Sequence, residues 1–277
     1  MLYCPHYYFH FPMKKIFTLL SLFALMFAFR AVTVPAPALA LTPFADVKSG
    51  DLIRGQAYPA VYYYGADGFR YVFPNDKAYF TWYSNFDSVK WISDTDLQSI
   101  QIGGNVTYRP GVKMIKINSD PKTYAVGQGG SLHWVTSEAI AIALYGSDWN
   151  KKIDDVPDGF FSNYKSGSDI TQATDFTPSS QTASSNTINH DKNLKAASNI
   201  SIRDGSFSPS SITINAGEAI KWTNTGSSKH SATDKSLNWG TGTLEPGQNF
   251  IRYFKTAGTY SYSCSYHPEM EGTIIVQ

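Results

Sequence analysis

The C-terminal region carries the run Cys264-Ser265-Tyr266-His267-Pro268-Glu269-Met270, which places a thiol, an imidazole and a thioether close together. Thiolate and imidazole ligands suit copper, and a thioether is a soft, weak additional ligand. A trigonal copper site needs a second imidazole, and His230 supplies one from further upstream. His230, Cys264, His267 and Met270 therefore predict one mononuclear copper site that moves single electrons.

The residues upstream of this run alternate apolar and polar side chains, with glycine and proline between the alternating stretches. Ile200 and Ile202 share one face, and Ile212 and Ile214 do the same in a later stretch. Such alternation is typical of strands with one buried face. About seven short strands in roughly eighty residues predict a β-sandwich over residues 198–277.

A set of residues spread over the same region matches the pattern of a known family. They are Phe207-Ser208-Pro209, Ile212, Gly217, Trp222-Thr223-Asn224, His230, Gly247, Phe254, Gly258-Thr259-Tyr260, Cys264, His267-Pro268, Met270 and Gly272-Thr273-Ile274-Ile275-Val276. On these residues the region resembles a cupredoxin of the plastocyanin and amicyanin group, with the short amicyanin-like loop between the cysteine and the methionine. The resemblance implies a Greek-key β-sandwich with one type 1 copper per chain. It also implies His230, Cys264, His267 and Met270 as the metal ligands.

The resemblance further implies how the site is braced and used. Ser231 is expected to hydrogen-bond across to the Cys264 loop, and backbone N–H groups are expected to donate to the sulfur. Asn224 either caps the same loop or simply ends its strand. His267 is expected to lie nearest the surface, where redox partner proteins dock. The apolar rim around it is expected to contain Phe207, Pro209 and Pro268.

Residues 1–40 are typical of an export signal. The basic run Met13-Lys14-Lys15 precedes an apolar stretch over 16–29, which is too short to span a bilayer comfortably, and Ala38-Leu39-Ala40 resembles a cleavage site. The alternative is an uncleaved anchor. Cleavage would leave Cys264 as the remaining cysteine of an exported protein, whether periplasmic, at the cell surface or secreted. An internal disulfide is then impossible.

Residues 41–166 form an aromatic block with a weak internal repeat. The stretch 62–72 recurs loosely as 124–135, and each copy predicts a strand, a glycine-rich turn, a second strand and a short helix. The block is therefore predicted to be an α+β domain of two hairpin-helix repeats in a chain that is mainly β. It resembles aromatic tandem units of bacterial secreted and surface proteins, which implies an anchoring or binding role toward a cell-envelope component.

Residues 167–197 are rich in Ser, Thr, Asn, Asp and Gln and poor in large apolar side chains. A segment of this composition buries too little apolar surface to offset the entropy lost on ordering. The sequence therefore predicts a Ser/Thr-rich linker that joins the domain at 41–166 to the sandwich at 198–277.

The charge and the histidine count exclude several functions. A net charge of +1, with 16% charged residues, provides no basic excess for nucleic-acid binding. After signal removal the histidines are His133, His190, His230 and His267, too few for a trinuclear or type 2 copper centre, so the chain is predicted not to be an enzyme. Two alternatives stay open. One is a copper storage or delivery protein, and the other is an envelope-binding surface protein with a secondary copper site.

Overall fold

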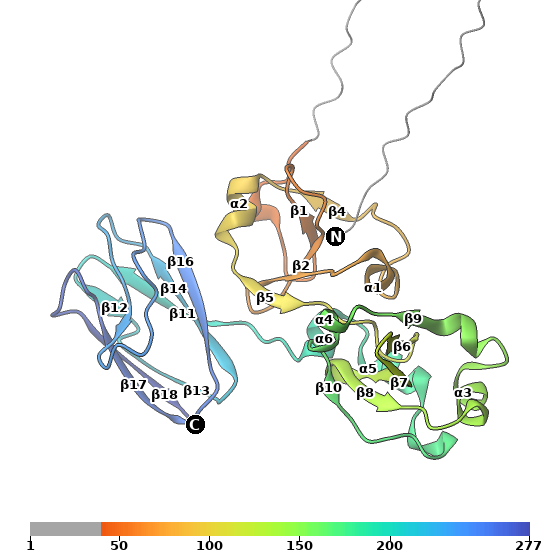
Figure 1. The fold of residues 1–277 in the computed structure, drawn as a ribbon. Coiled ribbons are helices and arrows are strands. Elements are labelled where there is room, and N and C mark those ends of the chain that lie inside the picture. Colours follow the sequence, from red (N-terminus) through yellow and green to blue (C-terminus); the bar gives the residue numbers. More distant parts are fainter. Residues whose placement is uncertain (1–39) are drawn as a thin grey trace, which may run out of the picture.

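The computed structural model describes residues 40–277, which form two aromatic sheet units, a helical segment and a β-sandwich (Figure 1). Apart from its last position, the export signal predicted at 1–40 lies outside the described residues. Among residues 40–277, no helix combines the length and the apolar character that crossing a bilayer requires.

Two five-stranded sheets make up the region of the predicted repeats, after the short 3-10 helix η1 (Phe44–Asp46). The first unit contains β1 (Leu52–Arg54), β2 (Tyr62–Tyr64), β3 (Arg70–Val72), α1 (Asp76–Phe80), β4 (Val89–Trp91), α2 (Asp94–Ser99) and β5 (Ile102–Asn105). The second contains β6 (Met114–Ile117), β7 (Asp120–Gly127), η2 (Gln128–Gly130), β8 (Ser131–Trp134), α3 (Glu138–Tyr145), η3 (Trp149–Lys152), β9 (Ile153–Asp155), α4 (Asp158–Phe161) and β10 (Lys165–Ser166).

The two sheets have the same internal arrangement. Their strand orders are β4-β1-β2-β3-β5 and β10-β8-β7-β6-β9. In each sheet, three consecutive antiparallel strands are flanked on both sides by a strand that pairs in parallel. The hairpin-helix repeat stays a prediction, and this shared order supports it.

Local sequence explains where the helices of these units begin and end. The Asn75 side chain accepts a hydrogen bond from the Ala78 N–H at 2.8 Å at the start of α1, and the Ser137 hydroxyl accepts one from the Ile140 N–H at 3.4 Å at the start of α3. Gly146 ends α3 with a φ of 87°, which glycine adopts without the strain that a Cβ would add.

The segment 167–197 differs from the unpacked linker that its composition predicts. It contains η4 (Ala173–Asp175), α5 (Pro178–Ser184) and α6 (Ile188–Lys192). Phe176 and Ile188 are buried, and the buried Asp191 carboxylate accepts the Gly129 N–H at 2.9 Å. The expectation of an unpacked segment is therefore wrong, because its few apolar residues are each covered by a neighbouring sheet unit. The domain boundaries themselves stay predictions.

Residues 198–277 form two packed four-stranded sheets, β12-β11-β14-β16 and β13-β18-β17-β15. Their elements are β11 (Ser198–Arg203), β12 (Ser206–Ser208), β13 (Ser211–Ile214), β14 (Glu218–Asn224), β15 (Thr233–Asp234), β16 (Asn249–Phe254), β17 (Gly258–Ser263) and β18 (Glu271–Val276). Parallel pairing joins β11 to β14 and β13 to β18, and the other neighbours pair antiparallel. The predicted fold class, mainly β with a C-terminal sandwich, is confirmed.

An aromatic core lies between the two sheets of the sandwich. Trp222 and Tyr262 are fully buried, with ring centroids 5.8 Å apart, and the Phe207 ring lies 4.8 Å from Tyr262. Phe207 is the inward residue of β12 and is only 3% exposed. The expectation that it lines an exposed rim around His267 is therefore wrong, because strand alternation turns it into the core.

The sandwich contacts the first sheet unit through the outer face of β16. The Gln101 amide donates to the Ile251 carbonyl at 3.1 Å and accepts from the Ile251 N–H at 2.5 Å. Tyr253 stacks on Phe69, with ring centroids 5.4 Å apart, and donates its hydroxyl to the buried Asp67 carboxylate. The two regions therefore share an interface that combines hydrogen bonds with aromatic packing.

Candidate metal centre

Two loops at one end of the sandwich hold the four residues that the sequence singles out. His230 follows β14 and is fixed by paired backbone bonds, with its N–H donating to the Leu244 carbonyl at 3.1 Å and its carbonyl accepting from Leu244 at 2.8 Å. Cys264 directly follows β17. Its N–H donates to the Met270 carbonyl at 3.1 Å, and the Met270 N–H donates to the His267 carbonyl at 2.9 Å. The second loop is therefore closed tightly on itself.

The structure brings three of the four predicted donors together. The Cys264 Sγ lies 3.6 Å from the His230 Nδ1 and 3.7 Å from the His267 Nδ1. Among residues 40–277, this is the one group of His, Cys, Asp or Glu donors compact enough to hold a metal ion, with all donor atoms within 4.8 Å of one another. Met270 is buried in the same core as Cys264 and is joined to it through the backbone.

The surroundings of Cys264 favour its thiolate form. Burial by itself would raise the pKa of this thiol, but the hydrogen bond from the Ser231 N–H and the contacts with the rings of His230 and His267 lower the pKa to about 6. Burial by itself would lower the pKa of His230, whereas its contacts with the Asp204 carboxylate and the Cys264 sulfur raise this pKa above the ordinary value. A thiolate is the form that binds metals, so the pocket is electrostatically prepared for a cation.

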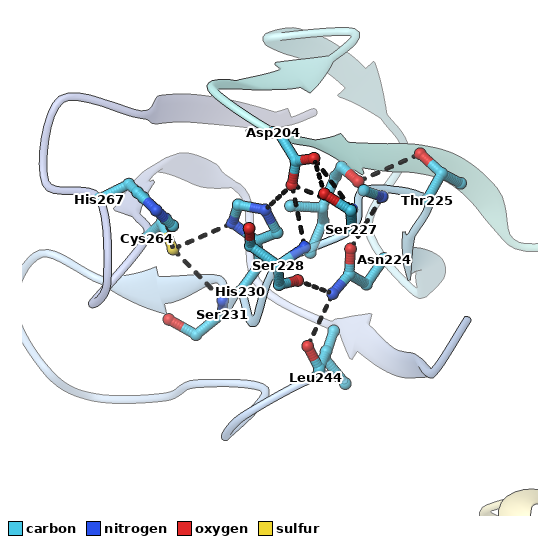
Figure 2. Close-up of polar contacts among 12 residues, drawn as sticks. Asp204, Asn224, Thr225, Ser227, Ser228, His230, Ser231, Leu244, Cys264 and His267 are labelled. Carbon is cyan, nitrogen blue, oxygen red and sulfur yellow. Dashed lines mark hydrogen bonds and ion pairs between the residues drawn. The ribbon is translucent and has the colours of Figure 1, made fainter. Parts of the chain in front are cut away.

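Two predictions about the bracing of the site are confirmed. The Ser231 N–H donates to the Cys264 Sγ at 3.4 Å (Figure 2). The Ser231 hydroxyl accepts the Ser265 N–H at 2.9 Å, which ties the first loop to the second. Since hydrogen bonds to a ligating sulfur change its electron donation, the Ser231 N–H is placed to tune a bound metal.

Asn224 ends β14, as one of its two expected roles requires, and its side chain also caps the loop that carries His230 rather than the Cys264 loop. Its side-chain amide donates to the carbonyls of Ser228 and Leu244, both at 2.8 Å, and its oxygen accepts the Gly226 N–H at 3.0 Å (Figure 2). The side chain is fully buried, and all of these partners belong to or flank the loop. Asn224 therefore fixes the backbone that carries His230.

Sequence reasoning missed Asp204, whose carboxylate lies 3.0 Å from the Nε2 of His230. Asp204-Gly205 follows the first strand of the sandwich and has the composition of an ordinary tight turn. The available signal is the register of β11 beside β14, which brings the residue after β11 to the loop after β14. The proximity of Asp204 to the loop after β14 becomes visible only once β11 and β14 are paired in the folded chain.

The donor set suits copper, as the residue types predict. A thiolate and two imidazoles are soft and borderline ligands, and a nearby thioether is typical of copper sites rather than of magnesium or calcium sites. Both His230 and Cys264 are inaccessible to solvent, whereas His267 is partly exposed. The arrangement can therefore hold one ion in a dry pocket with a single imidazole edge near the surface.

A two-layer sandwich with this thiol and imidazole group at one end defines a β domain that could hold a single metal ion. A family model described as a cupredoxin-like domain matches residues 174–276. Plastocyanin from Scenedesmus fuscus is 37% identical over 84 residues, which cover 26% of this chain and 86% of that protein. The chain belongs to the cupredoxin family.

Two further proteins are similar to a part of the chain of about the same length. Amicyanin-alpha from Methylorubrum extorquens is 34% identical over 79 residues, which cover 26% of this chain and 64% of that protein. The structure of a purple cupredoxin from Nitrosopumilus maritimus is 28% identical and covers 29% of this chain and 99% of that one, with a TM-score of 0.28. Proteins of this family bind copper, which agrees with the donor set described above.

Proposed function

We propose that the chain is an exported type 1 copper protein that carries single electrons, with the copper held by His230, Cys264, His267 and Met270. The observation that carries the proposal is the convergence of the Cys264 Sγ on two imidazole Nδ1 atoms, at 3.6 and 3.7 Å. The plastocyanin and amicyanin relatives support the same function by likeness. When bound, copper would supply a one-electron couple.

The chain's own residues keep the donors in one arrangement. Asn224 and Ser231 are hydrogen-bonded on both sides of the His230 backbone, and the Cys264 loop is closed by its own backbone bonds. Burial of His230 and Cys264 excludes water from the sulfur side of the site. A site held in this way rearranges little when its charge changes by one, which favours rapid electron transfer.

Redox partners are proposed to dock around His267. This imidazole is partly exposed, and its neighbours Tyr266, Pro268 and Glu269 are exposed on the same loop. The Tyr266 hydroxyl lies 2.6 Å from the Thr243 hydroxyl, so the exposed ring is anchored to the neighbouring loop. A net charge of +1 provides little long-range steering, so the rate of association should depend weakly on salt.

The absorption and EPR spectra of purified protein with one equivalent of copper(II) test the proposal. An electron carrier should become intensely blue, bleach with ascorbate and recover with an oxidant. Cys264→Ser should lose the colour, whereas Ser263→Ala should keep it, since that side chain lies on the opposite face of β17. A protein that prefers copper(I) and shows no strong colour would instead support storage or delivery. Copper-dependent turnover of oxygen or nitrite by the loaded protein would contradict a non-enzymatic role.

Export is tested by the mature N-terminus of protein recovered from its own cells. Cleavage after Ala40 should leave Leu41 as the first residue and place the protein outside the cytoplasm. Recovery of the uncleaved chain in the membrane fraction would favour the anchor instead. Recovery of the uncleaved chain in the cytoplasm would contradict export.

A binding role for residues 41–166 toward an envelope component is the remaining part of the proposal. A surface pocket of the second sheet unit is lined by Trp134 and Trp149 together with Thr123 and Glu138. Indole rings beside polar groups suit ligands that have both apolar faces and hydroxyls, such as wall saccharides. Full-length protein should co-sediment with insoluble wall polysaccharide, and Trp134→Ala should weaken this about tenfold. Equal sedimentation of the two proteins, or none, would count against the pocket.

A further inference from the structure

Asp204 reaches the metal centre because of the register of the sandwich. It follows β11, which pairs in parallel with β14 up to the partners Ile202 and Asn224. Parallel neighbours end at the same edge of a sheet, so the turn after β11 lies beside the loop that leads from β14 to His230. Gly205, with a φ of 95°, lets the chain reverse immediately after Asp204.

The Asp204 carboxylate is held in place by the loop that it faces. Its two oxygens accept the Ser227 N–H at 3.1 and 2.9 Å, the Ser227 hydroxyl at 2.6 Å and the Ser228 N–H at 3.1 Å (Figure 2). Gly226 leaves the space that this requires, since a Cβ there would lie 2.4 Å from the carboxylate oxygen. The carboxylate therefore has one position, although its side chain is about half exposed.

The remaining contact of this carboxylate is with the buried ring of His230. Its Oδ1 lies 3.0 Å from the His230 Nε2, while the Nδ1 of the same ring lies 3.6 Å from the Cys264 Sγ. A neutral imidazole carries one N–H, and a carboxylate can only accept, so this contact places the proton on Nε2. The lone pair of Nδ1 then faces the sulfur, as a metal ligand must.

We propose that Asp204 is a positioning residue for the metal centre, which fixes the tautomer and the ring orientation of His230 and adds negative charge behind that ligand. Carboxylates that accept the second N–H of a ligating histidine make it a better donor. Extra negative charge stabilises the more highly charged metal ion, so Asp204 favours copper(II) over copper(I). This redox consequence rests on the proposed function, whereas the positioning of the ring does not.

The positioning is tested without any metal. In the metal-free full chain, ¹H–¹⁵N correlation spectra of the histidine rings should show His230 protonated on Nε2, with slow exchange of that proton. Asp204→Ala should speed this exchange at least tenfold. Asp204→Asn keeps an acceptor oxygen and should preserve the tautomer, which also guards against loss of folding in the alanine variant. Glu245→Gln is the matched control, because it removes an exposed carboxylate that pairs with Lys229 beside His230.

Reduction potentials of the copper-loaded proteins test the effect of the charge. Asp204→Asn should weaken copper(II) binding relative to copper(I) by about tenfold, which raises the potential by about 59 mV for a one-electron couple. Asp204→Ala should also lose between tenfold and a hundredfold in copper affinity. A potential no higher than that of Glu245→Gln would overturn the proposal.

Failure of this inference is distinguishable from failure of the proposed function. Unaltered exchange of the His230 ring proton in Asp204→Ala overturns the positioning whether or not the protein binds copper. Absence of the blue spectrum in the copper-loaded wild-type protein would contradict the electron-carrier proposal. The ring spectra of the metal-free chain would still support the positioning, or overturn it, in that case.

Discussion

Buried polar side chains have different roles in the sandwich and in the aromatic sheet units. In the sandwich, buried Asn224, His230 and Ser231 all lie in or brace the loop that carries His230, and the Ser231 N–H and the His230 ring contact the Cys264 sulfur. In the sheet units and the helical segment packed against them, buried Asp67 and Asp191 instead connect separate elements, and their hydrogen bonds leave no shared centre for a ligand.

This difference shows how a ligand site can be distinguished from buried polar groups that only stabilise the fold. Both regions must satisfy buried polar atoms, since each unsatisfied group costs about 1–3 kcal/mol. A cross-link such as Asp67 with Tyr71 uses its hydrogen-bonding capacity on the protein itself. A ligand site keeps several donors aimed at one point, as Cys264 and the two imidazoles do.

The largest expected effect is on the acidity of the Cys264 thiol. In the folded, metal-free protein its pKa is about 6, far below the ordinary value of ~8.5. The protein should therefore carry a thiol below this pH and a thiolate above it. Ultraviolet thiolate absorbance against pH, with Cys264→Ser as the blank, measures the midpoint. In urea-unfolded protein the Cys264 thiol should titrate near its ordinary pKa. The same pKa in the folded protein would contradict a ligand site whose surroundings favour the thiolate.

The packed segment after the second sheet unit is the next test. Ile188 is 1% exposed at the start of α6, so Ile188→Ala should destabilise the protein by about 2–5 kcal/mol. Ile142→Ala is the matched control, because Ile142 is 44% exposed on α3 and should cost about 0.5 kcal/mol or less. Urea unfolding of the full chain measures both. A negligible change in the free energy of unfolding of Ile188→Ala would support the unpacked linker that the composition predicts.

The interface between the two regions gives a smaller expected effect. Tyr253→Phe removes one hydroxyl from the buried Asp67 carboxylate, which keeps its bonds to Tyr71 and the Phe69 N–H. The expected loss of stability is about 1–3 kcal/mol, with an unchanged copper spectrum. The control is Tyr260→Phe, whose hydroxyl donates to the exposed Thr256 carbonyl within the sandwich.

Equal losses of stability in the two tyrosine variants would show that the hydrogen bond to the buried Asp67 carboxylate adds nothing beyond an exposed hydrogen bond. A changed copper spectrum in Tyr253→Phe would show that the interface and the metal centre are coupled. Either result would contradict the distinction between the sandwich, whose buried polar groups surround a ligand site, and the sheet units, whose buried polar groups only stabilise the fold. Unfolding curves and absorption spectra of the same samples give both readouts.

How much the sequence could predict follows the same division. Chemistry restricts which residues can ligate copper, so His230, Cys264 and His267 were identifiable from type and order, and the structure brings their donors together. Phe207 lies in the core rather than at the rim around His267, because strand alternation turns its side chain inward. Asp204 needed the register of two parallel strands, which only the folded chain defines. The packing of Phe176 depends likewise on neighbours that are distant in sequence.

The smallest expected effect lies on the sandwich surface. Lys235 and Glu271 form an ion pair at 2.6 Å, with side chains 44% and 59% exposed. Solvent screens such a pair, and ordering two long side chains opposes it, so a double-mutant cycle with Lys235→Ala and Glu271→Ala should give a coupling of at most about 1 kcal/mol. The coupling should shrink further in 1 M salt. A salt-independent coupling above this size would mean that surface charge pairs, and not only the buried polar groups around Cys264, fix the loops that carry the site.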